Sequence, residues 1–483
     1  MPTPTVESAT RGDASALADA IRSGVLSASE AMEAALSAAA ANAALGAICH
    51  LDEARGREAA SALDAERADS PGHFSARPFG GVPSLAKDLG GPFAGFPVRA
   101  GSRMLDGMLD PARDSTLAAR FRQAGFALFG LTTSPEFGLS LASEPARGPI
   151  CRNPLDPSRT AGGSSGGAAA AVAAGIVAIA HATDAGGSIR VPAACCGLVG
   201  LKPTRGAIPG GPHFGNHLGG VASELAVCRS VRDTRAVLAA LRGMAKGPFA
   251  DPAENGAVGG VGAGLRIGVL TETGRDYPTD AAQSTAVSDA AKALEGVGHR
   301  IVSLRWAEFE DLVATSAGVF ADIVSVNLAR LAEAAALDLD LGEPLTRAFA
   351  QRGQKISGRD LWTSLDAAVH VSHRTWALFE SLDCLLMPML SSAPLPVGSF
   401  PTDHTDTDLH LQRMTAFAPL ASLANISGFP ALTLPFGTDA DGLPLPLQLM
   451  APMGCETLLL SLAAGLEREG RWQHRFAVAG LAA

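Results

Sequence analysis

The chain has 483 residues, with 38 lysines and arginines against 48 aspartates and glutamates, which gives a formal net charge of -10. No run of basic residues is present, so this balance argues against nucleic acid as a partner. The seven cysteines show no metal-ligand spacing, and we expect neither a metal nor another cofactor. The first residues form no apolar segment, and the longest run of small apolar residues, 166–180, is too short to span a bilayer. We therefore expect a cytoplasmic protein with no membrane attachment.

The first part of the chain is predicted to supply surface helices and one buried strand. Three helices are expected, over 13–23, 27–41 and 53–66. The second of them opens with a capping box formed by Ser27 and Glu30. The apolar residues 82–86 then predict a buried strand that ends at Lys87. This lysine either reaches water, which is the usual case, or is buried with a lowered pKa and serves as a base.

Two glycine–serine clusters organise the chain, GGSSGG at 162–167 and GGS at 186–188. Glycines at this density allow close approach of the backbone, and their N–H groups can converge on one point. A buried helix over 168–174 and a short strand over 176–180 are predicted to return the second cluster to the first. A serine beside converging N–H groups suggests acyl transfer. The alternative is a glycine-rich turn that binds phosphate or no ligand, although no phosphate-loop ending is present.

Strands and helices alternate along the rest of the chain. A strand over 265–270, a helix over 279–295 and a strand over 299–304 predict a β-α-β unit within a lobe at about 265–385. Further strands are expected over 385–389, 431–435 and 446–450. We predict one α/β domain spanning residues 1–483, with a large mixed β-sheet core surrounded by helices.

With the lysine and both clusters in view, the chain resembles the amidase signature family over almost its whole length. The segments that carry the resemblance are Gly81-Val82-Pro83 leading to Lys87-Asp88, GGSSGG at 162–167, DAGGSIR at 184–190 and GLKPT at 200–204. The order and spacing of these blocks are typical of the family. The resemblance implies the amidase signature fold and a catalytic unit made of serine, a serine that follows a cis peptide bond, and lysine.

The resemblance also implies a role for individual residues. Ser188 would be the nucleophile, Ser164 the bridging serine and Lys87 the base. The oxyanion hole would consist of the backbone N–H groups of Ala185, Gly186, Gly187 and Ser188. Residues that support these groups from behind would be Ser165, Asp184 and Arg190. Lys202 is the rival base but is interpreted as structural, and His181 is interpreted as a packed core residue.

The implied function is hydrolysis of a carboxylic amide to acid plus ammonia or amine through a Ser188 acyl-enzyme. One alternative is the amidase (A) subunit of a glutamyl-tRNA amidotransferase, and another is a non-catalytic binding protein on the same scaffold. Residues 144–154 are similar to those of stand-alone bacterial amidases, including the 6-aminohexanoate cyclic dimer hydrolases. The partner would be a small-molecule amide, and a homodimer is left open as the assembly.

The segments expected to border the site are 209–220, 391–401 and 415–425. They supply His213, Phe214, His217, Leu395, Phe417 and Leu420, and the named side chains include no lysine or arginine. An apolar pocket favours neutral aliphatic or aryl amides over a short charged one, because a buried carboxylate needs a paired cation. Arg190 is expected to hold Asp184 or a backbone carbonyl rather than the substrate.

Overall fold

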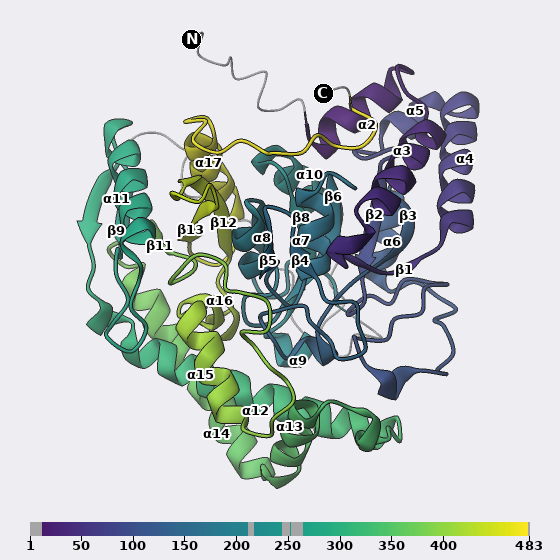
Figure 1. Cartoon of the computed structure of the whole chain (residues 1–483). Coiled ribbons are helices and arrows are strands. Elements are labelled where there is room, and N and C mark those ends of the chain that lie inside the picture. The colour runs from purple at the N-terminus through teal and green to yellow at the C-terminus, as the bar shows by residue number, and fades with distance from the viewer. Residues whose placement is uncertain (1–11, 211–216, 244–251, 253–263, 482–483) are drawn as a thin grey trace.

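The computed structural model describes residues 12–210, 217–243, 252 and 264–481. Eight strands form its central sheet: β6 (Ile179–Asp184), β7 (Val199–Lys202), β8 (Ser223–Cys228), β9 (Arg266–Val269), β10 (Arg300–Ser303), β11 (Cys384–Pro388), β12 (Ala431–Thr438) and β13 (Pro444–Met450). Their order is β10-β9-β11-β13-β12-β7-β8-β6 (Figure 1). Neighbours are parallel between β10, β9 and β11 and antiparallel elsewhere, so the predicted mixed sheet is confirmed.

A second sheet places the strand of Lys87 beside β6. It contains β1 (Ile48–Leu51), β2 (Pro83–Lys87) and β3 (Ala127–Thr132) in the order β1-β3-β2. The Ser84 hydroxyl on β2 donates a hydrogen bond to the Ile179 carbonyl on β6 at 2.9 Å. The strand that ends at Lys87 and the strand that leads into the second glycine–serine cluster therefore run close together. A small two-stranded sheet of β4 (Arg152–Asn153) and β5 (Asp156–Thr160) precedes the first glycine cluster.

The helices from the first half of the chain include those that pack on β2 and β3, those that pack on β7 and β8, and the one between the two glycine clusters. They are α2 (Ala14–Arg22), α3 (Ala28–Ala41), α4 (Glu53–Asp69), α5 (Pro71–Ser75), α6 (Thr116–Gln123), α7 (Gly166–Ala173), α8 (Arg190–Cys196), α9 (His217–Gly220) and α10 (Val231–Leu241). The capping box of Ser27 and Glu30 is present at the start of α3, as predicted. Every residue of α7 is buried, and its glycine and alanine side chains allow it to pack against strands on several sides.

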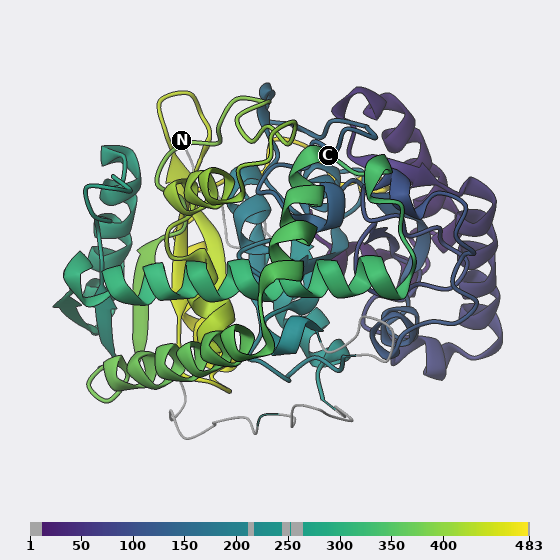
Figure 2. The ribbon, with the colours of Figure 1, turned by 90° about the horizontal axis from the view of Figure 1, so that it is seen from below.

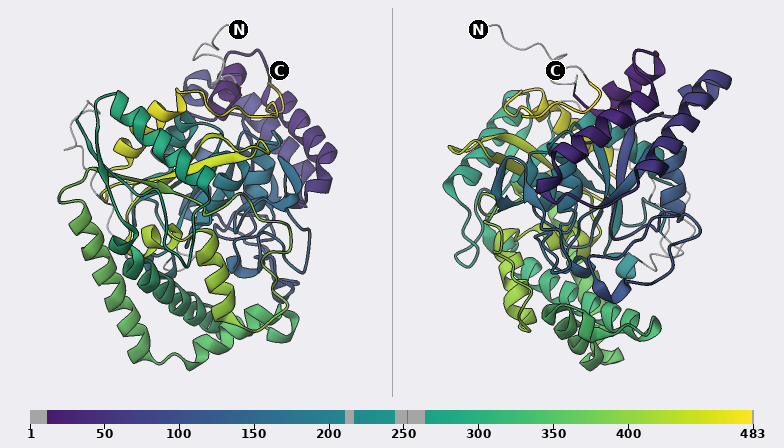
Figure 3. Two further views of the ribbon diagram at one scale, coloured as in Figure 1. Left: turned by 60° about the vertical axis from the view of Figure 1, so that its left-hand side comes forward. Right: turned by 45° about the vertical axis from the view of Figure 1, so that its right-hand side comes forward.

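The second half of the chain adds helices on both faces of the sheet, and the group of them gathered at the bottom of Figure 3 covers one face. The remaining helices are α11 (Ala281–Gly296), α12 (Glu310–Ala334), α13 (Pro344–Lys355), α14 (Gly358–Leu378), α15 (Thr407–Phe417), α16 (Ala421–Ser427) and α17 (Glu456–Glu467). Short 3-10 turns occur at Ala43–Leu45, Arg103–Leu105, Glu136–Gly138, Trp306–Glu308 and Leu339–Leu341. Figure 2 shows α12 as the long helix that crosses this side of the molecule. Within the described part of the chain, one helix, α12, is long enough and apolar enough to cross a membrane. Of its most apolar 18-residue window, 56% is buried inside the molecule. Buried core helices share this property.

The strand predicted over 176–180 is wrong, because β6 begins at Ile179 and continues to Asp184. The polar residues His181 and Thr183 continue this strand because both find buried hydrogen-bond partners, which an apolar pattern does not reveal. The lobe at about 265–385 stays a prediction: β9 and β10 continue the main sheet, while α12 and α14 pack on α16.

Candidate active site

Lys87 ends β2 in a fully buried position. Its Nζ lies 2.7 Å from the Ser164 Oγ and 2.8 Å from the Thr183 Oγ1. Burial lowers the pKa of Lys87 from 10.5 to about 7, and the charges of Asp184, Glu224 and Asp88 oppose this shift only in part. The amine is therefore available in its neutral form near neutral pH, while it contacts a hydroxyl that can donate a proton to it.

Ser164 lies in the tight turn that leads into α7. The peptide bond between Gly163 and Ser164 is cis, as the resemblance implies. A Cβ on Gly163 would lie 2.6 Å from the Ala142 nitrogen, so this position accepts only glycine. The Ser143 hydroxyl donates to the Ser164 carbonyl at 3.2 Å and accepts from the Gly166 N–H at 2.9 Å. These contacts fix the turn and leave the Ser164 side chain for Lys87.

Ser165 joins the two glycine–serine clusters. Its N–H donates to the Ser188 carbonyl at 3.3 Å. Its hydroxyl donates to the Thr183 carbonyl at 3.1 Å. The first cluster is thus hydrogen-bonded to both the end of β6 and the residue expected to act as nucleophile.

A buried ion pair holds the second cluster in its turn. The Nε and Nη2 of Arg190 donate to Asp184 at 2.9 and 3.0 Å, as expected for this pair. Burial alone would favour the neutral acid, but Arg190, with Asn425 and the Gly187 N–H, holds the pKa of Asp184 well below its usual range. Arg190 also donates to Gln448 on β13 at 2.7 Å. The turn is therefore anchored to the centre of the main sheet.

Ser188 ends this turn and is 7% exposed. Within the described part of the chain, its hydroxyl makes no hydrogen bond, and the N–H groups of Ala185, Gly186 and Ser188 have no hydrogen-bond partner. The N–H of Gly187 differs, since it donates to the Asp184 Oδ1 at 2.7 Å. Gly187 has a φ of +115°, and an added Cβ would lie 2.8 Å from that of Ala421. A serine hydroxyl and three N–H groups without partners thus occur in one turn.

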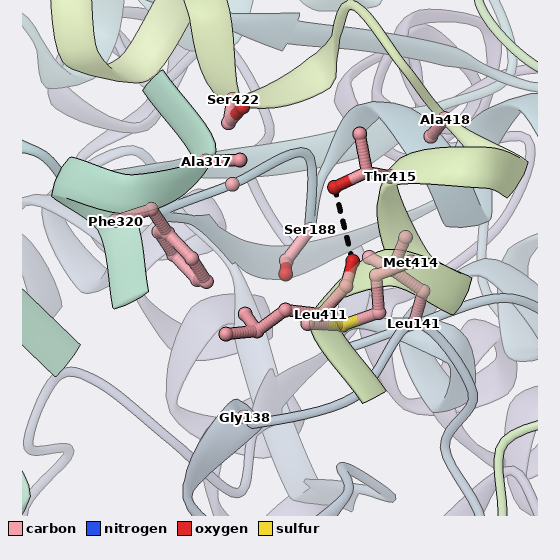
Figure 4. A pocket seen from close by; sticks show the side chains of 11 residues that line it. Gly138, Leu141, Ser188, Ala317, Phe320, Leu411, Met414, Thr415, Ala418 and Ser422 are labelled. Carbon is pink, nitrogen blue, oxygen red and sulfur yellow. Dashed lines mark hydrogen bonds between the residues drawn. The ribbon is translucent and has the colours of Figure 1, made fainter. Parts of the chain in front are cut away.

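Two cavities meet at Ser188. The larger, of about 460 Å³, is bordered by Ser164, Thr183 and Ala185 together with Ser188. The smaller, of about 40 Å³, lies between Ser188, Phe320 of α12 and the side chains of α15 (Figure 4). Ser188 can therefore meet a ligand from two sides.

The walls of these cavities differ in part from the predicted borders. Thr415, Ala418 and Ser422 come from the predicted segment 415–425, whereas Leu395, Phe417 and Leu420 border neither cavity. His213 and Phe214 lie outside the described residues, as does the side chain of His217. Much of the large cavity is formed instead by residues 89–111 and α12, and these bring in Arg99 and Arg330. The expectation of a border without arginine is therefore wrong.

His181 and Glu224 form a buried pair behind Lys87 that the sequence did not single out as functional. The Lys87 N–H donates to the His181 Nδ1 at 3.2 Å. The His181 Nε2, which must then carry the proton, donates to Glu224 at 2.8 Å. Phe93 and Phe121 pack on the imidazole, with ring centroids 4.9 and 5.7 Å away. His181 is a core residue, as interpreted, and it also orients the backbone of Lys87.

Lys202, the rival base, is equally buried but elsewhere. Its Nζ donates to the Pro203 carbonyl at 2.7 Å, and it borders neither cavity at Ser188. Burial, together with the charge of Arg190, lowers the pKa of Lys202 to about 7 as well. Among the described residues, no group of three or more histidine, cysteine, aspartate or glutamate side chains is placed to hold a metal ion.

Comparison with known proteins identifies the family. The Amidase family model matches residues 30–460. The 6-aminohexanoate-cyclic-dimer hydrolase of Paenarthrobacter ureafaciens is 34% identical over 493 aligned residues, which cover 96% of each chain. A solved structure of 6-aminohexanoate cyclic dimer hydrolase has 31% identity and a TM-score of 0.85, and covers 96% of this chain and 98% of that one. A bacterial aryl acylamidase with 23% identity and a TM-score of 0.81, covering 95% of this chain and 96% of its own, shares the fold.

These relatives bear the names of hydrolases and amidases, which does not favour the alternative of an amidotransferase subunit. The similarity extends over nearly the whole chain and includes the segments around both glycine–serine clusters. The chain belongs to the Amidase family, and it is an amidohydrolase acting on carbon–nitrogen bonds other than peptide bonds.

Proposed function

We propose that the protein hydrolyses a small-molecule carboxylic amide through an acyl-enzyme on Ser188, with Ser164 as proton relay and Lys87 as base. The observation that carries this proposal is the 2.7 Å contact between the Lys87 Nζ and the Ser164 Oγ, at the edge of the cavity that Ser188 borders. A base needs both a suitable pKa and a proton donor within reach, and Lys87 has both.

Acylation moves one proton through this relay. Ser164 gives its proton to the neutral Lys87 amine and takes the proton of Ser188, whose oxygen then bonds to the amide carbon. The two serine hydroxyls do not hydrogen-bond to each other in this structure. Such contacts commonly tighten only when substrate binds. We therefore place the Ser188–Ser164 hydrogen bond in the substrate complex.

Three backbone N–H groups would stabilise the oxyanion. Those of Ala185, Gly186 and Ser188 have no hydrogen-bond partner within the described part of the chain. A preorganised donor that faces the developing charge is worth about 3–4 kcal/mol in an acyl transfer reaction. Gly187 was also expected to donate, but its N–H already binds Asp184, and we leave it out of the oxyanion hole. Its role is to hold the turn.

The same relay works in reverse for the leaving group. The protonated Lys87 returns a proton through Ser164 to the amide nitrogen as the carbon–nitrogen bond breaks, and ammonia or an amine leaves. A water molecule then attacks the acyl-enzyme and gives its proton to the relay, and the acid departs as Ser188 regains a proton. Ser165, Asp184 and Arg190 act as positioning residues, since they hold the turn and touch none of the reacting atoms.

The large cavity suits an amide with an apolar portion. The relatives at 34% and 31% identity carry the name of a hydrolase of the 6-aminohexanoate cyclic dimer, which contains amide bonds in an aliphatic ring. We propose aliphatic and aryl amides as substrates and a cytoplasmic location, where the seven free cysteines would stay reduced. A homodimer stays a prediction, which light scattering of the purified chain would test.

Covalent labelling tests the proposed nucleophile directly. A serine-directed fluorophosphonate should add one label per chain, and peptide mapping by mass spectrometry should find that label on Ser188. Prior incubation with an amide that the enzyme hydrolyses should slow the labelling. A label found on Ser164 instead would reverse the roles of the two serines, and a protein that neither labels nor hydrolyses any amide would refute the proposal.

A further inference from the structure

The large cavity extends from Ser188 along one face of α12. Phe320 borders it next to Ser188, and Val324, Leu328, Leu331 and Ala335 follow at the spacing of one helix face. A helix rises 1.5 Å per residue, so the separation of ten positions between Phe320 and Arg330 corresponds to about 15 Å. One cavity thus joins the nucleophile to Arg330, about three helical turns away, and continues to Ala335.

The part of this cavity away from Ser188 is bordered by two polar side chains as well as by the apolar Leu331 and Ala335, which lie farther along α12. Asn327 and Arg330 lie there one turn apart, and within the described part of the chain neither side chain forms a hydrogen bond or an ion pair. Arg99, the other arginine in the wall, is by contrast fully engaged. It donates to the Asp110 carboxylate at 2.9 Å and to the Met108 carbonyl at 3.0 Å. Arg330 is exposed to solvent, and among the described residues it is the arginine of this wall that has no partner and can bind a ligand.

The positions of the two cavities indicate where the two parts of the substrate bind, which are the acyl group and the amine part, here called the amine arm. The leaving nitrogen receives its proton from Ser164, which borders the large cavity and not the small one. The amine arm therefore lies in the large cavity. The small cavity, of about 40 Å³, has room for roughly three water-sized groups, so it fits an acyl group as small as acetyl.

We propose that Arg330, assisted by Asn327, binds an anionic group at the end of an extended amine arm. The substrate class is then an amide of a short acyl group with a long ω-amino acid, and this inference rests on the proposed function. A guanidinium and a carboxamide both donate to a carboxylate, and the apolar wall between them and Ser188 matches a chain of methylene groups.

The helix sets the preferred length of that arm. Long side chains on a helix point back toward its N-terminus, so the guanidinium reaches several ångströms from the Arg330 backbone toward Ser188. The guanidinium of Arg330 is therefore roughly 8–15 Å from the scissile amide. An extended chain spans this distance with about 7–13 bonds. A carboxylate nearer the amide would be buried against the apolar wall without a cation. The effect of a substrate carboxylate should therefore change sign as the arm lengthens.

A series of N-acetyl-ω-amino acids, from N-acetylglycine to N-acetyl-12-aminododecanoate, tests this length dependence. Each acid is compared with its uncharged methylamide, and hydrolysis is followed by the acetate released. For long arms we expect the charged compound to have the higher kcat/KM by about three- to tenfold, mostly through KM, and for N-acetylglycine the lower. Arg330→Gln should remove the advantage of the long acids and leave their methylamides unchanged. Arg330→Lys should keep part of this kcat/KM advantage, and Asn327→Leu should reduce the advantage less than Arg330→Gln does.

Arg359→Gln is the matched control, because it removes an exposed arginine on α14 that borders neither cavity. Calorimetric binding of N-acetyl-8-aminooctanoate to Ser188→Ala, with and without Arg330→Gln, measures the anchor without turnover. Equal binding by these two proteins would overturn the anchor. A charge preference that depends on Arg330 only in monoamides of dicarboxylic acids would overturn the arm assignment. In both cases the proposed function would still stand if the protein hydrolysed neutral amides and Ser188 took up the label. If the proposed function itself were wrong, both the hydrolysis and the labelling of Ser188 would be absent.

Discussion

Lys87 and Lys202 are two buried lysines in matching positions, and they make different contacts. Each is the last residue of its strand, β2 or β7, and they are 0% and 1% exposed. Burial lowers the pKa of both to about 7. The Nζ of Lys87 contacts the hydroxyls of Ser164 and Thr183, whereas that of Lys202 contacts the carbonyl of Pro203.

The comparison shows that a lowered pKa alone does not identify a catalytic base. A hydroxyl both donates and accepts hydrogen bonds, so Ser164 can hand a proton to Lys87. A carbonyl oxygen only accepts, so Pro203 has no proton to give to Lys202. The contacts of the amine therefore distinguish Lys87, the proposed base, from Lys202, which is interpreted as structural, whereas burial and pKa do not.

The largest expected effect tests whether Lys87 serves Ser188 at all. Ser188→Ala should lower amide hydrolysis to below about one per cent of the wild-type rate, because no oxygen remains to form the acyl-enzyme. The fold should persist, since the hydroxyl makes no hydrogen bond within the described part of the chain. Activity and circular dichroism of the purified variant check both points. Turnover above that level would mean that Lys87 activates another nucleophile.

Replacing each lysine by methionine tests the comparison itself. Lys87→Met should lower kcat by about 10²–10⁴-fold, the usual contribution of a general base, while Lys202→Met should retain most activity. The two variants are matched controls, since each removes a buried amine from the end of a strand. Steady-state kinetics on one neutral amide measures both. Equal losses would mean that either Lys202 also transfers protons or both changes act through the fold.

A pair of carboxylate substitutions should affect the two lysines separately. The activity of the wild type should rise with pH through the pKa of Lys87, near 7, because only the neutral amine accepts a proton. The charge of Glu224 raises the pKa of Lys87, and that of Glu456 raises the pKa of Lys202. Glu224→Gln should therefore move the acid limb of the rate profile to lower pH, by less than about one unit, since its carboxylate binds His181 and not Lys87.

The control for that shift is Glu456→Gln, which should leave the limb in place. A limb that moves equally in both variants would mean that the titrating group is neither lysine. A limb that stays in place in Glu224→Gln would mean that Lys87 does not set the pH dependence. The profile of kcat/KM from pH 5 to 10 distinguishes these results.

The parts of the site that depend on residues close together in the sequence could be predicted. The parts that depend on contacts between distant segments could not. The glycine–serine clusters placed Ser164 and Ser188 beside one pocket, and the apolar strand placed Lys87 at a buried end. Thr183, a hydrogen-bond partner of Lys87, was missed because it lies beyond the predicted end of its strand, and Glu224, which binds His181, was missed because it comes from β8. The cavity wall was missed for the same reason, since residues 89–111 and α12 meet only through the tertiary fold. Burial and pKa at Lys87 could be stated only as alternatives, because both depend on those distant contacts.

The smallest effect on activity should accompany a measurable change in stability. The pKa of Lys202 falls from 10.5 in the unfolded chain to about 7 in the folded one. Between these values the unfolded chain binds a proton that the folded chain does not, so this site makes stability rise with pH through that window. Below about pH 7 both states are protonated, and the full cost of burying the charge remains. Lys202→Met removes that cost, so its stability relative to wild type should be highest near pH 7 and fall by up to a few kcal/mol toward pH 10.

Urea denaturation at pH 7 and 9.5 measures the difference, and other titrating groups cancel between the two proteins. Lys87→Met should show the same trend, because its depressed pKa has the same cause. A pH-independent difference for Lys202→Met would mean that this lysine does not titrate in the window, and the resemblance between the two lysines would then end at their burial.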